Sequence, residues 1–144
     1  DHERPLNPRG QTSAAALGDW MRDCGLVPDQ CLVSTAVRTQ ETFARLCLGP
    51  SAEPVSALYH ASPETMLRVL RQATGKTVLM VGHNPGISIF AQLLIQRWPE
   101  HERFGDFPTG ATLVARFDSS SWQDVALQTG DVIDFVIPRE LLAQ

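Results

Sequence analysis

The segment Thr77–Phe90, TVLMVGHNPGISIF, most constrains how this chain can fold. It opens with a continuous apolar run, Thr77–Val81, which is typical of a strand covered on both faces of a sheet. An apolar pattern with helical spacing then predicts a helix over Pro85–Trp98, with proline at the first helical position and Asn84 as its N-cap. The sequence therefore predicts a strand that delivers His83 to the start of a helix.

The same alternation of strand and helix runs along the chain before this segment. Apolar spacing and Gly, Pro, Asn and Ser signals predict helices from Pro8 to a stop at Gly25, over Arg38–Leu48 and from Pro63 onward, and strands over Cys31–Ser34, Val55–Tyr59, Thr112–Phe117 and Val132–Ile137. The last two strands lack a long helix between them and are predicted to pair antiparallel. The pattern predicts an α/β fold, a mainly parallel sheet sandwiched between helices, with functional groups at the carboxyl ends of its strands.

Composition limits the classes of partner. With 144 residues, 43% hydrophobic and 19% charged, the chain is predicted to form one domain over residues 1–144. A net charge of −4 argues against a nucleic-acid partner, because such proteins usually carry a basic patch. The apolar runs are too short for a membrane-spanning helix, so we predict a soluble, cytoplasmic protein with no membrane partner. The composition leaves the oligomeric state open.

The cysteines and most of the histidines show no ligand spacing. Cys24, Cys31 and Cys47 are odd in number and form no Cys-x-x-Cys pair, so we predict buried free thiols and neither a disulfide framework nor a zinc site. The other histidines, which share no metal-like spacing, are predicted to be exposed or structural: His2, His60 and His101. No metal or other cofactor is predicted.

His83 and Asn84 occupy a position that suits an anion. Free N–H groups and the positive end of the following helix favour a phosphate there, and the His83 imidazole can donate a hydrogen bond to it. We therefore predict that His83 and Asn84 help to bind phosphate. A histidine that hydrogen-bonds only within its own turn fits this position equally well.

Two arginines are further candidates. Arg38 lies in the first turn of its helix, after the strand Cys31–Ser34, where its planar fork could hold two phosphate oxygens. Taken alone, it also fits a solvated helix residue. Arg4, in the segment Arg-Pro-Leu near the start of the chain, is by itself an ordinary surface residue.

Four segments in order, DHERPLNPRG, PDQCLVSTAVRTQETF, ALYHASPETML and VLMVGHNPGIS, resemble the histidine phosphatase superfamily, in particular its SixA-like phosphohistidine phosphatase branch. The tail from FPTGATLV onward also resembles this branch, so the resemblance covers nearly the whole chain. It implies a phosphoglycerate mutase-like three-layer sandwich without a helical lid subdomain. It also implies metal-independent phosphoryl transfer through a phosphohistidine enzyme intermediate. The residues that match the family's phosphate-binding and catalytic positions are Arg4, Arg38 and His83.

One departure from the family concerns the nucleophile. In the family, a histidine in an Arg-His-Gly or Arg-His-Ala motif at the end of the first strand precedes the Asp-x-x-Arg-Pro-Leu segment, and this sequence starts at that segment. His2 is a poor substitute, because no apolar strand precedes it. We therefore expect an additional apolar strand ending in Arg-His upstream of Asp1, and an encoded start at Asp1 would contradict this.

A second departure concerns the general acid. Larger relatives protonate the leaving oxygen with a Glu or Asp after the third strand. Glu64 in this region instead fits a residue in the first turn of a helix, where its negative charge interacts favourably with the helix dipole. An imidazole leaving group needs less help from an acid than an alkoxide does. The absence of this acid is therefore compatible with a phosphohistidine substrate.

The leading prediction is a phosphatase that hydrolyses phosphohistidine on a protein or peptide. A phosphatase for small phosphate esters or phosphoserine on the same scaffold is a first alternative. A non-catalytic module that binds phosphate or a phosphoprotein is a second, if the chain truly starts at Asp1. A structural domain with coincidental motifs is the remaining alternative.

Overall fold

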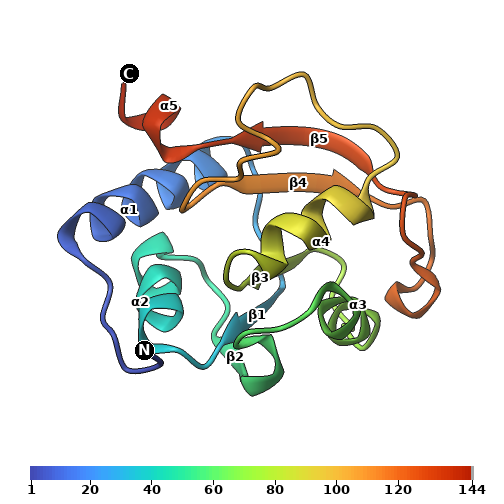
Figure 1. The fold of residues 1–144 in the computed structure, drawn as a ribbon, viewed down its shortest axis with the longest axis horizontal. Helices are drawn as coiled ribbons and strands as arrows, with labels where there is room; N and C mark the ends of the chain where they lie inside the picture. The colour runs from blue at the N-terminus through green and yellow to red at the C-terminus, as the bar shows by residue number, and fades with distance from the viewer. Residues whose placement is uncertain (144) are drawn as a thin grey trace.

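A computed structural model describes residues 1–143. The elements, in chain order, are α1 (Pro8–Asp23), β1 (Gln30–Ser34), α2 (Val37–Leu46), β2 (Ala52–Val55), the 3-10 turn η1 (Ser56–Leu58), α3 (Pro63–Arg71), β3 (Val78–Val81), α4 (Gly86–Leu94), β4 (Thr112–Arg116), the 3-10 turn η2 (Trp122–Asp124), β5 (Asp131–Val136) and α5 (Pro138–Leu142). Figure 1 shows their arrangement. The predicted α/β class is confirmed.

The parallel sheet has the strand order β2-β1-β3. β1 is its central strand, with Ser34 opposite Val55 of β2 and Val33 opposite Val81 of β3. Since all three strands run in one direction, their carboxyl ends lie at the same edge of the sheet. The segments that follow these ends are therefore brought together. β4 and β5 form a separate antiparallel pair, as predicted, with a register irregularity between Val114 and Ala115.

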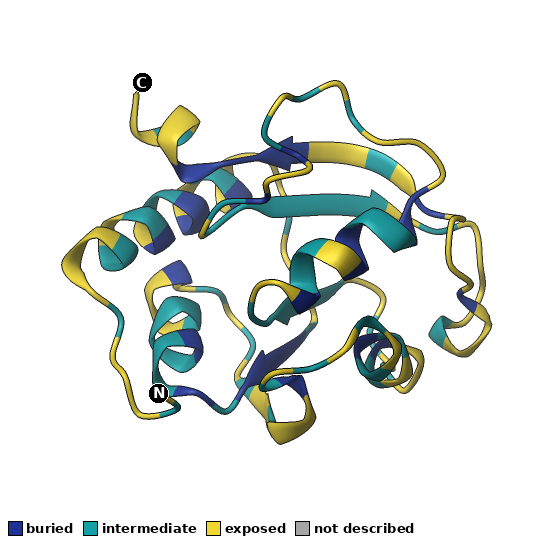
Figure 2. Ribbon diagram, in the orientation of Figure 1, coloured by how far each residue is buried: buried dark blue, intermediate teal, exposed yellow. Residues whose placement is uncertain are grey.

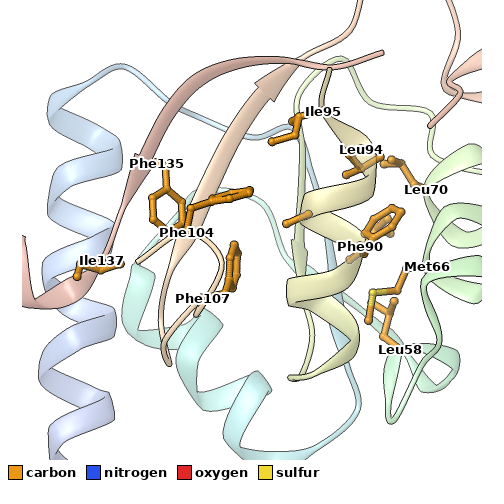
Figure 3. Close-up of a cluster of buried hydrophobic side chains, with 12 residues drawn as sticks. Leu58, Met66, Leu70, Phe90, Leu94, Ile95, Phe104, Phe107, Phe135 and Ile137 are labelled. Carbon is orange, nitrogen blue, oxygen red and sulfur yellow. The ribbon is translucent and has the colours of Figure 1, made fainter. Parts of the chain in front are cut away.

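Helices cover the sheets on two sides. In Figure 1, α1 and α2 lie to the left of the parallel strands, and α3 lies to their right with α4. Two hydrophobic clusters match this division. Adjacent residues of β5 point to opposite faces, so Phe135 joins the larger cluster, with α3 and α4, and Val136 joins the smaller one, with α1 and α2. Figure 3 shows the larger cluster, in which the fully buried Phe104 packs beside Phe107 and Phe135.

The helix ends follow local sequence signals. The side chain of Asn7 accepts a hydrogen bond from the Gly10 N–H at the start of α1, and Ser62 caps α3 in the same way. Gly25 after α1 has a φ of 70°, a backbone conformation that favours glycine. The predicted beginnings of α1 and α3 and the stop at Gly25 are confirmed.

Some predicted boundaries were wrong. The strand predicted over Val55–Tyr59 lies earlier, at β2, and the residues that follow it form η1. Pro54 within β2 obscured this strand, but proline is acceptable there because β2 is an edge strand. α4 ends at Leu94 instead of Trp98, because Ile95 turns extended and bridges to Gly130.

The prediction of buried thiols holds for Cys31 and is wrong for Cys24 and Cys47, which are exposed. Both exposed thiols are C-caps, Cys24 of α1 and Cys47 of α2. A residue at a helix end leaves the periodic apolar face, which explains the error. Within residues 1–143, no helix is long and apolar enough to span a membrane.

β3 and β4 are only half-buried, although the apolar run of β3 predicts a strand covered on both faces of the sheet. Every residue of β3 and the first four of β4 are partly accessible, whereas Cys31, Leu32, Val33 and Ser34 of β1 are buried. Figure 2 shows this contrast. Among the described residues, β3 pairs only with β1, and β4 pairs only with β5. Each of these two strands therefore has one edge without a strand partner.

Candidate active site

The candidate site lies at the carboxyl edge of the parallel sheet. β1 ends at Ser34 and leads to Arg38 in the first turn of α2. β2 and η1 lead to Tyr59, and His83 follows β3. Three strand ends thus supply groups to one place, as predicted from the alternation of strands and helices.

His83 is held between Arg38 and Ser34. The Arg38 guanidinium Nη2 lies 3.1 Å from His83 Nδ1, and His83 Nε2 lies 2.8 Å from Ser34 Oγ. Because a guanidinium can only donate, Nδ1 is the acceptor, and the ring proton is on Nε2 and is donated to Ser34. Thr39 Oγ1 in turn donates to the Ser34 carbonyl at 2.9 Å, which anchors the end of β1.

The electrostatic environment keeps His83 neutral. Burial lowers the pKa of His83 to about 4, and the charge of Arg38 and the neighbouring imidazoles of His60 and His2 act in the same direction. Near neutral pH the ring is therefore an uncharged imidazole. Its predicted hydrogen bond to an anion requires a proton on Nδ1, the atom that now accepts from Arg38.

Arg4 and Arg38 meet at the carboxylate of Asp1. Arg4 Nε lies 3.5 Å from Asp1 Oδ1, and Arg38 Nη2 lies 3.3 Å from Asp1 Oδ2. Tyr59 Oη donates to the same Oδ2 at 3.3 Å, and Arg38 Nη1 donates to the Asp1 carbonyl at 2.9 Å. The Arg38 side chain is only 19% exposed, against 64% for Arg4. An anionic group thus already occupies the position where the two predicted phosphate-binding arginines converge.

Asn84 does not act as the predicted N-cap. Pro85 is the N-cap of α4, which begins at Gly86, and the Asn84 amide donates instead to the Phe107 carbonyl at 3.0 Å. The sequence predicts Asn84 as the N-cap and Pro85 as the first helical residue, whereas in the structure both roles fall one residue later, on Pro85 and Gly86. The contribution of Asn84 to phosphate binding stays a prediction.

The remaining histidines differ in their surroundings. His101 lies 3.0 Å from Glu140 and packs edge-on against Phe135, which fits the predicted structural role. His2 Nε2 lies 2.9 Å from Thr35 Oγ1. His60 is exposed but stacks on Tyr59. In the part of the chain that the structure describes, no cluster of His, Cys, Asp and Glu could hold a metal ion.

Three contributors to the site were missed from the sequence. Ser34 could have been found, because it ends a predicted strand at the functional edge. Tyr59 was assigned to a strand, so its position in a loop was hidden. Asp1 is the first residue of the Asp-x-x-Arg-Pro-Leu segment, but that segment alone does not place its carboxylate between two arginines.

Sequence comparison finds relatives of similar length. No protein-family model matches the chain. An uncharacterized protein of Mycobacterium tuberculosis strain H37Rv, Rv1276c, is 33% identical to it, over 96% of this chain and 92% of its own length. The uncharacterized protein ML1117 of Mycobacterium leprae is 29% identical, over 96% of this chain and 89% of its own.

Solved structures identify the fold. The candidate phosphohistidine phosphatase SixA from Nakamurella multipartitia superimposes with a TM-score of 0.86 at 27% identity, over 96% of this chain and 87% of that one. The candidate SixA from Agrobacterium tumefaciens superimposes with a TM-score of 0.76 at 26% identity, over 96% of this chain and 86% of that one. The protein histidine phosphatase SixA in complex with tungstate superimposes with a TM-score of 0.79 at 20% identity, over 98% of this chain and 88% of that one. At this identity the match supports the fold alone. The strand order, the converging site and these matches together place the chain in the histidine phosphatase superfamily of hydrolases, with a SixA-like fold.

Proposed function

We propose that the protein is a phosphatase that hydrolyses phosphohistidine on a protein or peptide, through a phosphohistidine enzyme intermediate. The observation that carries the proposal is the convergence of Arg4 and Arg38 on one carboxylate beside His83. A carboxylate and a phosphoryl group present similar oxygen acceptors to a guanidinium. A phosphoryl group in place of the Asp1 carboxylate would therefore meet the same donors. The SixA neighbours support the substrate class, and a cytoplasmic location stays a prediction.

His83 and the arginines have separate roles in this proposal. Arg4 and Arg38 neutralise the phosphoryl oxygens, and Arg38 does so from a largely buried position where its charge is little screened. A bound dianion adds negative charge next to His83, which raises the pKa of this imidazole from about 4 and favours a proton on Nδ1. Once Arg38 turns from Nδ1 to the phosphate, that proton can be donated to a phosphoryl oxygen.

The nucleophile in this proposal is a histidine upstream of Asp1, at the end of an additional strand. The half-buried strands β3 and β4 support this part, because each has an edge without a strand partner among residues 1–143. In Figure 1, β3 is the strand of the parallel sheet that lies toward β4. A strand inserted between them would cover both edges and present its carboxyl end beside His83. The intact mass and N-terminal sequence of the protein from its natural host test this directly.

The activity is tested on the full-length protein with three substrates: a phosphohistidine peptide, a phosphoserine peptide and a small phosphate ester. We expect release of inorganic phosphate, fastest from the phosphohistidine peptide. Arg38→Ala and His83→Ala should each lower kcat/KM by at least about 100-fold, because each removes a charged or hydrogen-bonding group from the transferred phosphoryl.

Arg45→Ala is a matched control, because Arg45 lies in the same helix as Arg38 and hydrogen-bonds Gln11, away from the site. It should leave kcat/KM unchanged. Faster turnover of the esters than of phosphohistidine would favour the alternative substrate class. Binding of tungstate without turnover of any substrate would favour the non-catalytic binding module.

A further inference from the structure

His60 is held in an unusual conformation at the open side of the site. Its backbone φ is 54°, in the left-handed region that non-glycine residues seldom adopt. Its ring stacks on Tyr59, with centroids 4.0 Å apart and an interplanar angle of 19°. The side chain is 66% exposed, and one face of its ring lies against Tyr59.

The ring faces the same anion position as Arg38 and Tyr59. His60 Nε2 lies 3.9 Å from Asp1 Oδ2, the oxygen to which Arg38 Nη2 and Tyr59 Oη also point. The ring centroids of His60 and His83 are 6.5 Å apart and perpendicular. An oxyanion in place of the Asp1 carboxylate would thus lie near His60 and against Arg38, whose guanidinium also contacts His83.

The two histidines differ in access to solvent. His83 is half-buried and bonded through both ring nitrogens to Ser34 and Arg38. His60 is exposed, and its Nε2 lies 3.9 Å from the Asp1 carboxylate. A substrate must enter from the exposed side, so its leaving group lies on the side of His60. An imidazole is a suitable proton donor there, because histidine is the side chain that most often serves as a general acid or base.

We propose that His60 is a catalytic residue that donates a proton to the leaving group, which extends the substrate class to phosphate esters. This inference rests on the proposed phosphatase function. In the first step the upstream histidine forms a bond to phosphorus while the bond to the leaving oxygen or nitrogen breaks. The leaving atom keeps the electron pair and takes the proton from His60 Nε2, which leaves His60 neutral.

The second step restores the starting state. A water oxygen forms a bond to phosphorus while the bond from phosphorus to the enzyme histidine breaks, and that histidine nitrogen keeps the electron pair. His60 removes a proton from the water as it attacks and becomes an imidazolium again. The net reaction is hydrolysis of the substrate, and no proton is lost or gained by the enzyme.

The test compares two substrates of the full-length protein that differ in leaving group. The phenolate of phenyl phosphate needs a proton to leave, whereas that of 4-nitrophenyl phosphate does not. If His60 donates the proton, His60→Gln should lower kcat/KM for phenyl phosphate by about 100-fold and for 4-nitrophenyl phosphate by less than about 3-fold. A purely structural role would lower both values alike, and that result would overturn the inference.

Glu64→Gln is the matched control, because Glu64 is an exposed acid close in sequence that serves the first turn of α3. It should leave kcat/KM for both substrates unchanged. A loss for phenyl phosphate alone in this variant would assign the proton to Glu64 and overturn the role of His60.

An independent readout is the NMR spectrum of the histidine rings. Tungstate should shift the ring resonances of His60 and leave those of His101 in place; unshifted His60 resonances would contradict the contact.

The outcomes separate the inference from the function on which it rests. If the unmodified protein turns over both substrates and His60→Gln lowers both kcat/KM values equally, the phosphatase function is supported and the proton-donor role of His60 is refuted. No turnover of any substrate by the unmodified protein refutes the proposed function, and the proton-donor role falls with it.

Discussion

Removal of the Arg38 side chain should weaken oxyanion binding more than any other single change to an arginine of this chain. Its guanidinium donates to the Asp1 carbonyl at 2.9 Å and to His83 Nδ1 at 3.1 Å, and it lies 3.3 Å from the Asp1 carboxylate. At 19% exposure its charge is poorly screened, so a bound dianion would gain most of its electrostatic stabilisation from this group.

The magnitude follows from charge and distance. Opposite unit charges about 4 Å apart at an effective dielectric near 20 attract by roughly 4 kcal/mol before desolvation. A hydrogen bond to a charged group contributes about 1.5–3 kcal/mol net. An oxyanion must displace the Asp1 carboxylate, which offsets part of this stabilisation. We therefore expect Arg38→Ala to lower the binding free energy of the oxyanion by about 1.5–2.5 kcal/mol, which is an affinity lower by about 10- to 60-fold.

Isothermal titration calorimetry with tungstate measures this change directly in Arg38→Ala, with Arg45→Ala as control. Thermal unfolding of both variants checks that the fold is retained. NMR titration of Arg38→Ala should also show the pKa of His83 above its value of about 4, because a positive neighbour is lost, and below 6.5, because burial remains. An affinity within about threefold of the original, or an equal loss in Arg45→Ala, would refute the assignment.

Two further predictions concern stability. The pKa of His83 is about 4 in the folded chain against 6.5 for a free histidine, so the unfolded chain binds the proton more tightly and stability is lost as pH falls from 6.5 toward 4. The full pKa shift corresponds to roughly 3 kcal/mol, and because His83 is partly exposed we expect the free energy of unfolding to fall by about 1–2 kcal/mol. Urea titrations at several pH values should show this fall, and they should show a weaker dependence on pH in His83→Gln. A side chain on Gly18 would collide with the Leu46 carbonyl where α1 meets α2, so Gly18→Ala should destabilise by about 1–3 kcal/mol in the same titrations. Gly49→Ala, with open space around it, should be close to neutral; equal effects would contradict the packing argument.

The fold was largely predictable, because periodic patterns and helix caps are local. Asn7, Ser62 and Gly25 mark helix ends through bonds and backbone angles within a few residues, and the structure confirms them. The exposure of β3 was not predictable, because it depends on which strands lie beside it. Asn84 shows the same limit within a turn: its amide bonds to Phe107, a residue distant in sequence.

The site was predictable in its outline and not in its contacts. Arg38 and His83 could be placed at one sheet edge from the parallel order alone. The position of Asp1 between two arginines depends on how the first segment packs across that edge, which no local pattern encodes. The direction of the His60 ring depends likewise on stacking with Tyr59 and on a backbone turn that histidine seldom adopts.

The contacts around Asp1 join parts of the chain that are far apart in sequence. The first segment, the start of α2, the loop after η1 and the end of β3 meet only when the whole domain is folded. An oxyanion bound there therefore has no affinity for the unfolded chain, and by mass action it stabilises the entire fold, by about 2.7 kcal/mol at a concentration of 100 times Kd. The unfolding temperature should rise with ligand concentration, so phosphorylated compounds can be ranked as ligands of this protein before any turnover is measured.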